Sequence, residues 1–300
     1  MGHRRRAAGS LAPWLAEVDT VVHTSPQKPL EGRSAGVRRG DARRYADTDR
    51  EDAAARANMY TFLSAVFLHP PTGDLVRQIM DQTFLTDLSA LFSREAVMEL
   101  RRFAANASVD ADLASLRQEY MDLFAVPTGR YVTPFEDVYQ GEGIDGALER
   151  GPLLGERAIA VRRLYRQAGA EMTRECRELP THIGVELSFM AFLCEREREA
   201  ISRDDAGIGS AETDGATGTP GCYRGLQLRF LQNHLNAWFP QLRKAIQAHA
   251  KSRLYPGLAL ITEEFLLRDA GSFCCYPRQP EMHRPAPPPR PESEVGPDGR

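Results

Sequence analysis

The sequence predicts an all-helical protein built as one bundle-like domain. Apolar residues recur at spacings of three and four along several segments, the clearest being Met59, Phe62, Leu63, Val66 and Phe67. No segment shows the sustained apolar–polar alternation between hairpin turns that would indicate strands. At 300 residues, with 42% hydrophobic and 26% charged residues, the chain is long enough to bury a sizeable core.

The helices expected in the first half follow from these stripes and from their stop and start signals. The first stripe ends at His69-Pro70-Pro71, because proline disrupts a helix interior. Asp74 is the expected cap of a second helix containing Leu75, Val76, Ile79 and Met80. Ser93 is the expected cap of a third, with Val97 and Leu100 inside it, and a fourth begins at Ser108 or Asp110.

Further helices are expected in the second half. One covers residues 152–168 and ends at Gly169, where a left-handed cap is expected. The next has Pro180 in its first turn and is apolar nearly all round, so it belongs in the centre of the bundle. Its charged end, Glu195–Glu199, is expected to emerge into water. Three more helices follow, the first of them ending at Phe239-Pro240.

Composition divides the chain into five parts. The expected division is a disordered basic tail over 1–51, a main helical part over 52–202, a flexible linker over 203–221, a C-terminal helical cap over 222–268 and a proline-rich tail over 269–300. Arg4-Arg5-Arg6 does not indicate an export signal, because Glu17 and Asp19 follow too soon for an uncharged apolar region.

Charge, cysteines and motifs exclude several functions. The net charge of −3 gives no global argument for nucleic acid or an anionic membrane, and no stretch approaches the roughly 20 apolar residues of a membrane span. The five cysteines include no CxxC, and the adjacent Cys274 and Cys275 do not complete a zinc site, so reduced thiols are expected. Neither GxxxxGK, GxGxxG nor HExxH occurs, so we expect no cofactor and no enzymatic activity.

The chain is organised around residues 117–139. The fourth helix ends there, because Pro127, Gly129 and Pro134 follow within a few residues, yet the loop keeps aromatic side chains. Such a loop either packs on the core or lines a groove, and the sequence leaves both open.

Three motifs occur in order along the chain. The first comprises Glu119, Tyr120, Leu123, Phe124, Pro134, Glu136, Val138 and Tyr139. The second comprises Pro180, His182, Ile183, Glu186, Leu187, Phe189 and Met190, and the third is FLQNHLNAWFP over residues 230–240. Together they resemble the TorD/DmsD family of chaperones for molybdenum redox enzymes, related more distantly to the NarJ group. Two features depart from the family pattern: Thr181 replaces an Asp, and Val126-Pro127-Thr128-Gly129 replaces G-P-G.

The resemblance implies a cytoplasmic, system-specific chaperone. Its partners would be the twin-arginine leader and the apo form of a molybdopterin-dependent oxidoreductase, whose export waits for cofactor insertion. An apolar leader helix would be buried in a groove. The expected peptide-binding residues are Tyr120, Leu123, Phe124, Pro134, Phe135, Glu136, Tyr139, His182 and Glu186. The leader's arginines would meet carboxylates of Glu119, Glu136, Asp137 or Glu142. The chain would be a monomer or a dimer that exchanges its C-terminal helices.

Other interpretations of the same residues stay open. His182 and Glu186 are spaced i, i+4 and fit half of a metal site in a helical-bundle metalloprotein, or His182 has a structural or capping role. His234 fits a packed helix residue, and Glu136 with Asp137 fits a solvated turn. The arginine-rich tail would serve a nucleic-acid binder.

Overall fold

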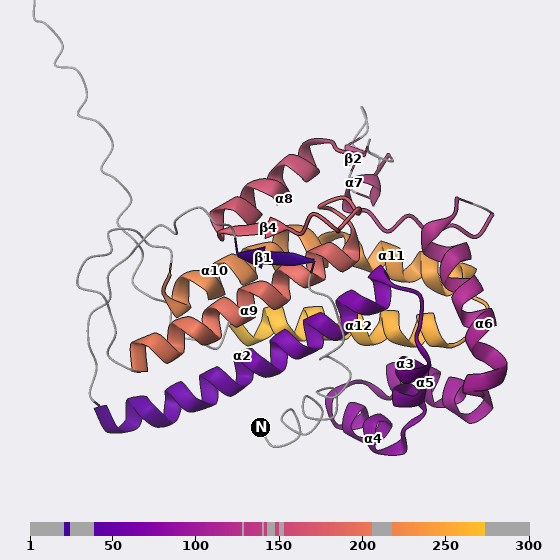
Figure 1. Ribbon diagram of the computed structural model, residues 1–300, viewed down its shortest axis with the longest axis horizontal. Coiled ribbons are helices and arrows are strands. Elements are labelled where there is room, and N and C mark those ends of the chain that lie inside the picture. The colour runs from indigo at the N-terminus through magenta and orange to yellow at the C-terminus, as the bar shows by residue number, and fades with distance from the viewer. Residues whose placement is uncertain are drawn as a thin grey trace, which may run out of the picture.

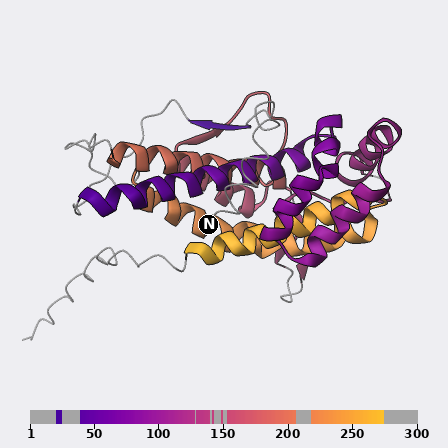
Figure 2. The same ribbon diagram turned by 90° about the horizontal axis from the view of Figure 1, so that it is seen from below.

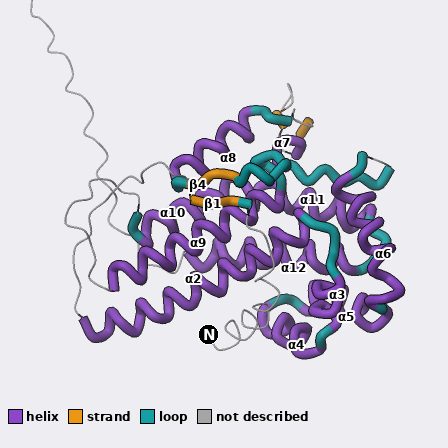
Figure 3. The backbone as a smooth tube through the Cα atoms, viewed as in Figure 1, coloured by secondary structure: helices purple, strands orange, loops and turns teal. Residues whose placement is uncertain are grey.

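The all-helical prediction is confirmed by the computed structural model of the chain, apart from two short strand pairs (Figure 3). The structure describes residues 21–24, 39–127, 129–139, 141–142, 148–149, 153–205 and 218–273. The Arg4-Arg5-Arg6 segment, most of the predicted linker, Cys274 with Cys275 and residues 274–300 of the predicted proline-rich tail lie outside these residues. Residues 269–272 of that predicted tail belong instead to the last helix. Within them, Cys176, Cys194 and Cys222 are free thiols, and no described helix has the length and apolar content to cross a bilayer.

Two long helices form the centre of the bundle, α2 (Arg39–Leu68) and α9 (Ile183–Asp205), which pack along each other (Figures 1 and 2). Gly184 permits the close approach, because a Cβ there would overlap the side chain of Leu68. The Ser64 hydroxyl donates to the Gly184 carbonyl oxygen at 2.7 Å. The first half of α9 is buried on every face, as its apolar sequence predicts.

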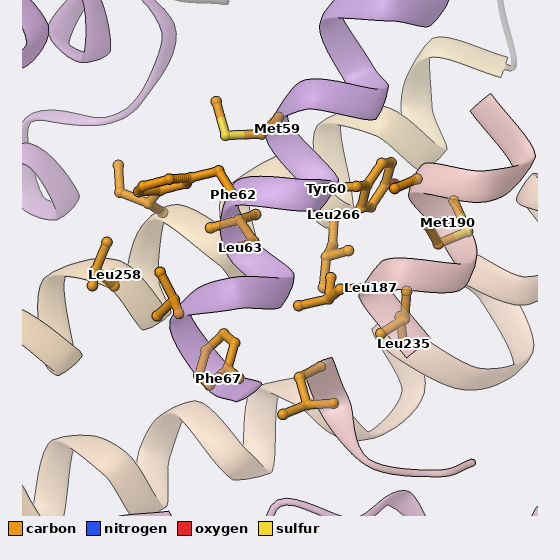
Figure 4. Close-up of a cluster of buried hydrophobic side chains, with 14 of the residues drawn as sticks. Met59, Tyr60, Phe62, Leu63, Phe67, Leu187, Met190, Leu235, Leu258 and Leu266 are labelled. Carbon is orange, nitrogen blue, oxygen red and sulfur yellow. The ribbon is translucent and has the colours of Figure 1, made fainter. Parts of the chain in front are cut away.

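The remaining helices surround this pair. At one end of the molecule lie α3 (Gly73–Met80), α4 (Gln82–Leu91), α5 (Arg94–Asn106) and α6 (Val109–Tyr120) (Figure 1). Helix α10 (Pro220–Phe230) packs on α9, and α11 (Asn236–His249) packs on α12 (Leu254–Ser272). Helix α12 also packs against α5, where a Cβ on Gly257 would lie 2.6 Å from Leu100 Cδ2. One apolar core therefore joins both ends of the described chain, and Figure 4 shows part of it.

Two helical segments widen into π turns. The turn η1 (Met121–Ala125) continues α6, and η2 (Leu231–Leu235) connects α10 to α11. Such turns often occur near functional sites. Both lie inside the sequence motifs.

Several predicted helix ends are confirmed and others are wrong. Ser93 caps α5 and Gly169 has φ of 70° after α8 (Glu156–Gln167), as expected. The cap of α3 is Thr72, whose hydroxyl accepts from Leu75 N, and not Asp74. Pro180 precedes α9, which begins at Ile183. The expected helix end at Phe239-Pro240 is wrong, because α10, η2 and α11 continue one another in helical conformation and Pro240 lies inside α11.

The N-terminal region has more structure than expected. Helix α2 begins at Arg39, and strand β1 (Val22–Thr24) pairs antiparallel with β4 (Ala170–Met172). Val21 and Val22 are buried, which explains why this short segment joins the core. A second pair joins β2 (Gly141–Glu142) to β3 (Leu148–Glu149).

The expectation that residues 195–199 emerge into water is wrong for Glu197. Its side chain is fully buried and accepts from Arg56 Nη2 at 2.6 Å and from Gln227 Nε2 at 2.9 Å, and Arg224 also contacts it. A buried carboxylate is tolerated only with such partners. This group of side chains connects α2, α9 and α10.

Candidate functional site

The first two motifs meet through backbone hydrogen bonds. Phe135 and His182 form an isolated antiparallel bridge. Glu136 N donates to the Thr181 carbonyl at 2.9 Å, and Ile183 N donates to the Pro134 carbonyl at 2.8 Å. The loop after η1 is thereby fixed to the start of α9 and continues into α7 (Glu136–Tyr139).

The third motif completes a buried polar cluster. His234 Nδ1 lies 2.9 Å from Glu136 Oε2, and Trp238 Nε1 donates to Glu186 Oε2 at 3.0 Å. All four side chains are at most 4% exposed. We call Glu136, Glu186, His234 and Trp238 the carboxylate cluster. Each of the three motifs contributes to it, which gives their joint occurrence a physical reason.

The surroundings of Glu186 favour the protonated form of its side chain. Its pKa is raised well above the ordinary value, first by burial and then by the neighbouring Glu136 carboxylate. Glu186 Oε1 has no hydrogen-bond donor in the described part of the chain. Burial beside a second carboxylate therefore favours the protonated form of Glu186.

Asp137 fixes the neighbouring helix. Its Oδ1 accepts from Ala158 N at 3.2 Å, in the first turn of α8, and its Oδ2 accepts from the Thr181 hydroxyl at 2.6 Å. The carboxylate thus caps α8 from another element. Thr181, which departs from the family's Asp, acts here as the donor that satisfies Asp137.

We expect Thr181→Asp to destabilise the protein by about 1–3 kcal/mol at neutral pH, because it replaces a donor to Asp137 by a second carboxylate. Urea denaturation followed by circular dichroism measures this. Thr181→Ser keeps the hydroxyl and is the control. If both variants have the same free energy of unfolding at pH 7, the hydrogen bond from the Thr181 hydroxyl to Asp137 does not contribute to stability.

His182 has the capping role that the sequence left open. It precedes α9, and its Nδ1 accepts from Gly184 N at 3.1 Å. Burial, with a smaller contribution from His69, lowers its pKa to about 3, so the ring is neutral. Its other contact is edge-on with Phe135 at 5.3 Å between ring centroids. Within the described residues, no group of three or more His, Cys, Asp or Glu side chains is arranged to hold a metal ion.

The upstream part of the first motif is packed inside the bundle. Tyr120, Leu123 and Phe124 are buried, and the Phe124 ring contacts Phe67 and Tyr255. The Tyr120 hydroxyl donates to the Phe67 carbonyl at 3.1 Å. Of the two interpretations of this segment, the structure shows core packing for these three side chains.

The carboxylates expected at a groove rim are also engaged elsewhere. Glu119 Oε1 accepts from Lys251 N at 2.5 Å and from Ser252 N at 2.8 Å, which holds the turn between α11 and α12. Glu136 and Asp137 are buried, so a solvated turn is wrong for them. The Glu142 side chain lies outside what the structure describes.

Two of the expected peptide-binding residues reach the surface. Phe135 and Tyr139 are half-buried, and Tyr139 stacks on Trp238 at 5.5 Å between centroids. Pro134, Glu136, His182 and Glu186 are buried beneath them. A separate cavity of about 330 Å³ lies between α5, α6 and the α11–α12 turn, and Glu119 is the one predicted rim residue in its lining.

Sequence reasoning placed His234 in a packed helix, which is confirmed, but missed that it contacts Glu136. A usable signal was present, since His234 and Trp238 are four residues apart and so lie on one helical face. Their partners are distant in sequence, and the pattern alone does not identify them.

These features define a helical bundle in which three separated motifs meet around buried carboxylates. A profile of the family described as "Nitrate reductase delta subunit" matches residues 90–244. This is more than half of the chain and includes all three motifs, so the protein belongs to this family, and the TorD-type resemblance is confirmed.

Curated relatives agree with this assignment. The chain is 28% identical over 168 residues to a chlorate reductase assembly chaperone of Ideonella dechloratans, covering 54% of this chain and 74% of the relative. It is 27% identical over 180 residues to a selenate reductase assembly chaperone of Thauera selenatis, covering 58% and 80%. It is 24% identical over 241 residues to the chaperone TorD of Colwellia psychrerythraea, covering 73% and 92%.

Proposed function

We propose that this protein is a non-enzymatic, cytoplasmic assembly chaperone for a molybdopterin-dependent oxidoreductase. In this role it binds the twin-arginine leader of the precursor and keeps the apoenzyme available for cofactor insertion before export. The observation that carries the proposal is the family match, together with relatives named as assembly chaperones of chlorate and selenate reductases.

The leader-binding surface that we propose is centred on the exposed edges of Phe135 and Tyr139. Both are aromatic and half-buried: Phe135 packs on His182, and Tyr139 stacks on Trp238 of the carboxylate cluster. A preorganised aromatic surface suits an apolar helix, because little side-chain entropy is lost on binding. The buried members of the predicted set act by holding this surface in place, and reach a ligand only if the loop over residues 126–139 moves.

Glu178 is a better partner for a leader arginine than the buried acids. Its side chain is exposed. Burial is the larger cause of the raised pKa of Tyr120 and of Tyr131, and the nearby Glu178 carboxylate raises both pKa values further. Partial burial raises the pKa of Glu178 itself. A guanidinium group would relieve that cost.

The test is titration of the purified protein with the leader peptide of the oxidoreductase encoded beside it. We expect binding at or below about ten micromolar, that is, near −7 kcal/mol. Glu178→Gln should weaken binding about fivefold to tenfold through loss of a charge-assisted hydrogen bond. It should have no effect on a peptide whose two arginines are replaced by glutamine.

Glu175→Gln is the matched control, since Glu175 is an exposed acid three residues away. A folded protein that ignores the peptide at about a hundred micromolar would refute leader binding. Equal effects of both substitutions would instead refute the role of Glu178 alone.

A further inference from the structure

Helix α8 exposes one stripe to solvent and buries the other. Ile159, Arg162, Arg163 and Arg166 are exposed and follow the i, i+3, i+4, i+7 spacing of a single helical face. Ala158, Val161 and Tyr165 on the opposite face are buried. The Tyr165 hydroxyl donates to the Pro180 carbonyl at 2.9 Å, which fixes the orientation of the helix. Figure 1 shows α8 on the outside of the molecule, beside β4.

No acidic side chain in the described part of the chain pairs with the arginines of this stripe. Within the described residues, Arg162, Arg163 and Arg166 form no ion pair and no side-chain hydrogen bond. On α9, by contrast, Arg196 pairs with Glu199 and Arg198 pairs with Glu195, each at 2.7 Å. The single acidic residue of α8 is Glu156, at the opposite end from Arg166. A chain with net charge −3 therefore carries a local basic surface here.

The other end of the stripe is apolar. Leu153, Leu154 and Ile159 are 50%, 53% and 55% exposed, among the most exposed large apolar side chains that the structure describes. Leu154 has φ of 64°, a left-handed conformation that a side chain with a Cβ disfavours. Strained backbone that holds a leucine toward solvent is a feature of binding sites more than of packing. Asp137 anchors the turn by capping α8.

We propose that these six residues form a docking face, the α8 face, comprising Leu153, Leu154, Ile159, Arg162, Arg163 and Arg166. It binds a segment of the client polypeptide that carries acidic side chains next to apolar ones. This inference rests on the proposed chaperone function. The segment belongs to the mature part of the client, because a leader with two arginines is repelled by the basic stripe.

A protein segment fits this face better than a lipid surface does. The three apolar side chains are 50–55% exposed and lie at one end of the stripe, so the apolar surface is short. Binding to a bilayer interface needs the apolar face of a helix to be buried about 5–10 Å into the headgroup/acyl boundary. Contact with a partner chain needs only surface complementarity and opposite charge.

The experiment uses the full chain and three probes: the leader peptide, the leaderless form of the oxidoreductase encoded beside it, and vesicles of phosphatidylglycerol and phosphatidylcholine. Arg162→Glu/Arg166→Glu is compared with Arg94→Glu/Arg229→Glu, which makes the same charge change at exposed arginines on α5 and α10. We expect the α8 double variant to bind the leaderless client at least about tenfold more weakly, with a reduced salt dependence. Its affinity for the leader peptide should not fall. Circular dichroism and the Tm check that both variants are folded.

Three outcomes would overturn the proposal. The wild type does not bind the leaderless client, or both double variants weaken its binding equally, or the α8 variant loses affinity only for vesicles of phosphatidylglycerol and phosphatidylcholine. A failure of the leader peptide to bind the wild type would count against leader recognition and would leave the result with the leaderless client to decide this inference.

Discussion

Replacing Arg56 by methionine should destabilise the protein by about 3–5 kcal/mol, the usual cost of removing one member of a buried ion pair. Arg56 is 5% exposed. It donates to Glu197 at 2.6 Å and to Gln227 Oε1 at 2.5 Å, and it lies 3.7 Å from Asp269 Oδ1. Methionine fills most of the space but removes the charge that faces Asp269 and leaves Glu197 with Arg224 as its cationic partner. Urea denaturation gives the free energy of unfolding.

The control for this prediction is Arg50→Met on the same helix. Arg50 pairs with Asp47 in solvent, where an ion pair contributes at most about 1 kcal/mol. A loss for Arg56→Met no larger than that for Arg50→Met would contradict the prediction. Whole domains are stable by only about 5–15 kcal/mol, so the expected loss is a large part of the total.

Arg56 also illustrates where sequence reasoning reaches its limit. Apolar spacing predicted the core face of α2, because burial of one face imposes that period, and the nearly continuous apolar sequence of α9 predicted its central place. The burial of Glu197 was not predictable, since Arg56 is 141 residues away and nothing local to Glu197 distinguishes it from the charged residues around it. Helix α4 was also missed, although Asp81 caps it, because its stripe is short.

Part of the candidate site was also predictable from the sequence, and part of it was not. The motifs identified the residues that converge, because a family pattern records positions that the fold needs. They did not show that Tyr120 and Phe124 point into the core, since an aromatic side chain beside a proline turn suits packing and binding equally. The contacts from Glu136 to His234 and from Glu186 to Trp238 required three-dimensional information.

The carboxylate cluster links these motifs to pH. Glu186 faces Glu136 and Asp137 from α7, Trp238 from α11 and Tyr165 from α8, and His234 from η2 contacts Glu136. Burial and the two acids raise its pKa, so the folded protein binds a proton that the unfolded chain releases near pH 4.5. Between that pH and the raised pKa, the folded state holds more protons than the unfolded state. Stability from this group is therefore complete below about pH 4.5 and is lost as pH rises.

Glu186→Gln should consequently make the protein less sensitive to alkaline pH. Glutamine keeps an oxygen to accept from Trp238 Nε1 and does not titrate. The wild type should therefore lose stability relative to the variant as pH rises above 4.5, with a limiting slope of about 1.4 kcal/mol per pH unit up to the raised pKa of Glu186. Unfolding free energies of both proteins, measured from pH 5 to pH 8, test this.

The control is Glu175→Gln. The Glu175 side chain is exposed, so this variant should keep the pH slope of the wild type. Parallel curves for wild type and Glu186→Gln would contradict the raised pKa of Glu186, because they would show that its carboxyl group is already ionised in the folded protein over this pH range.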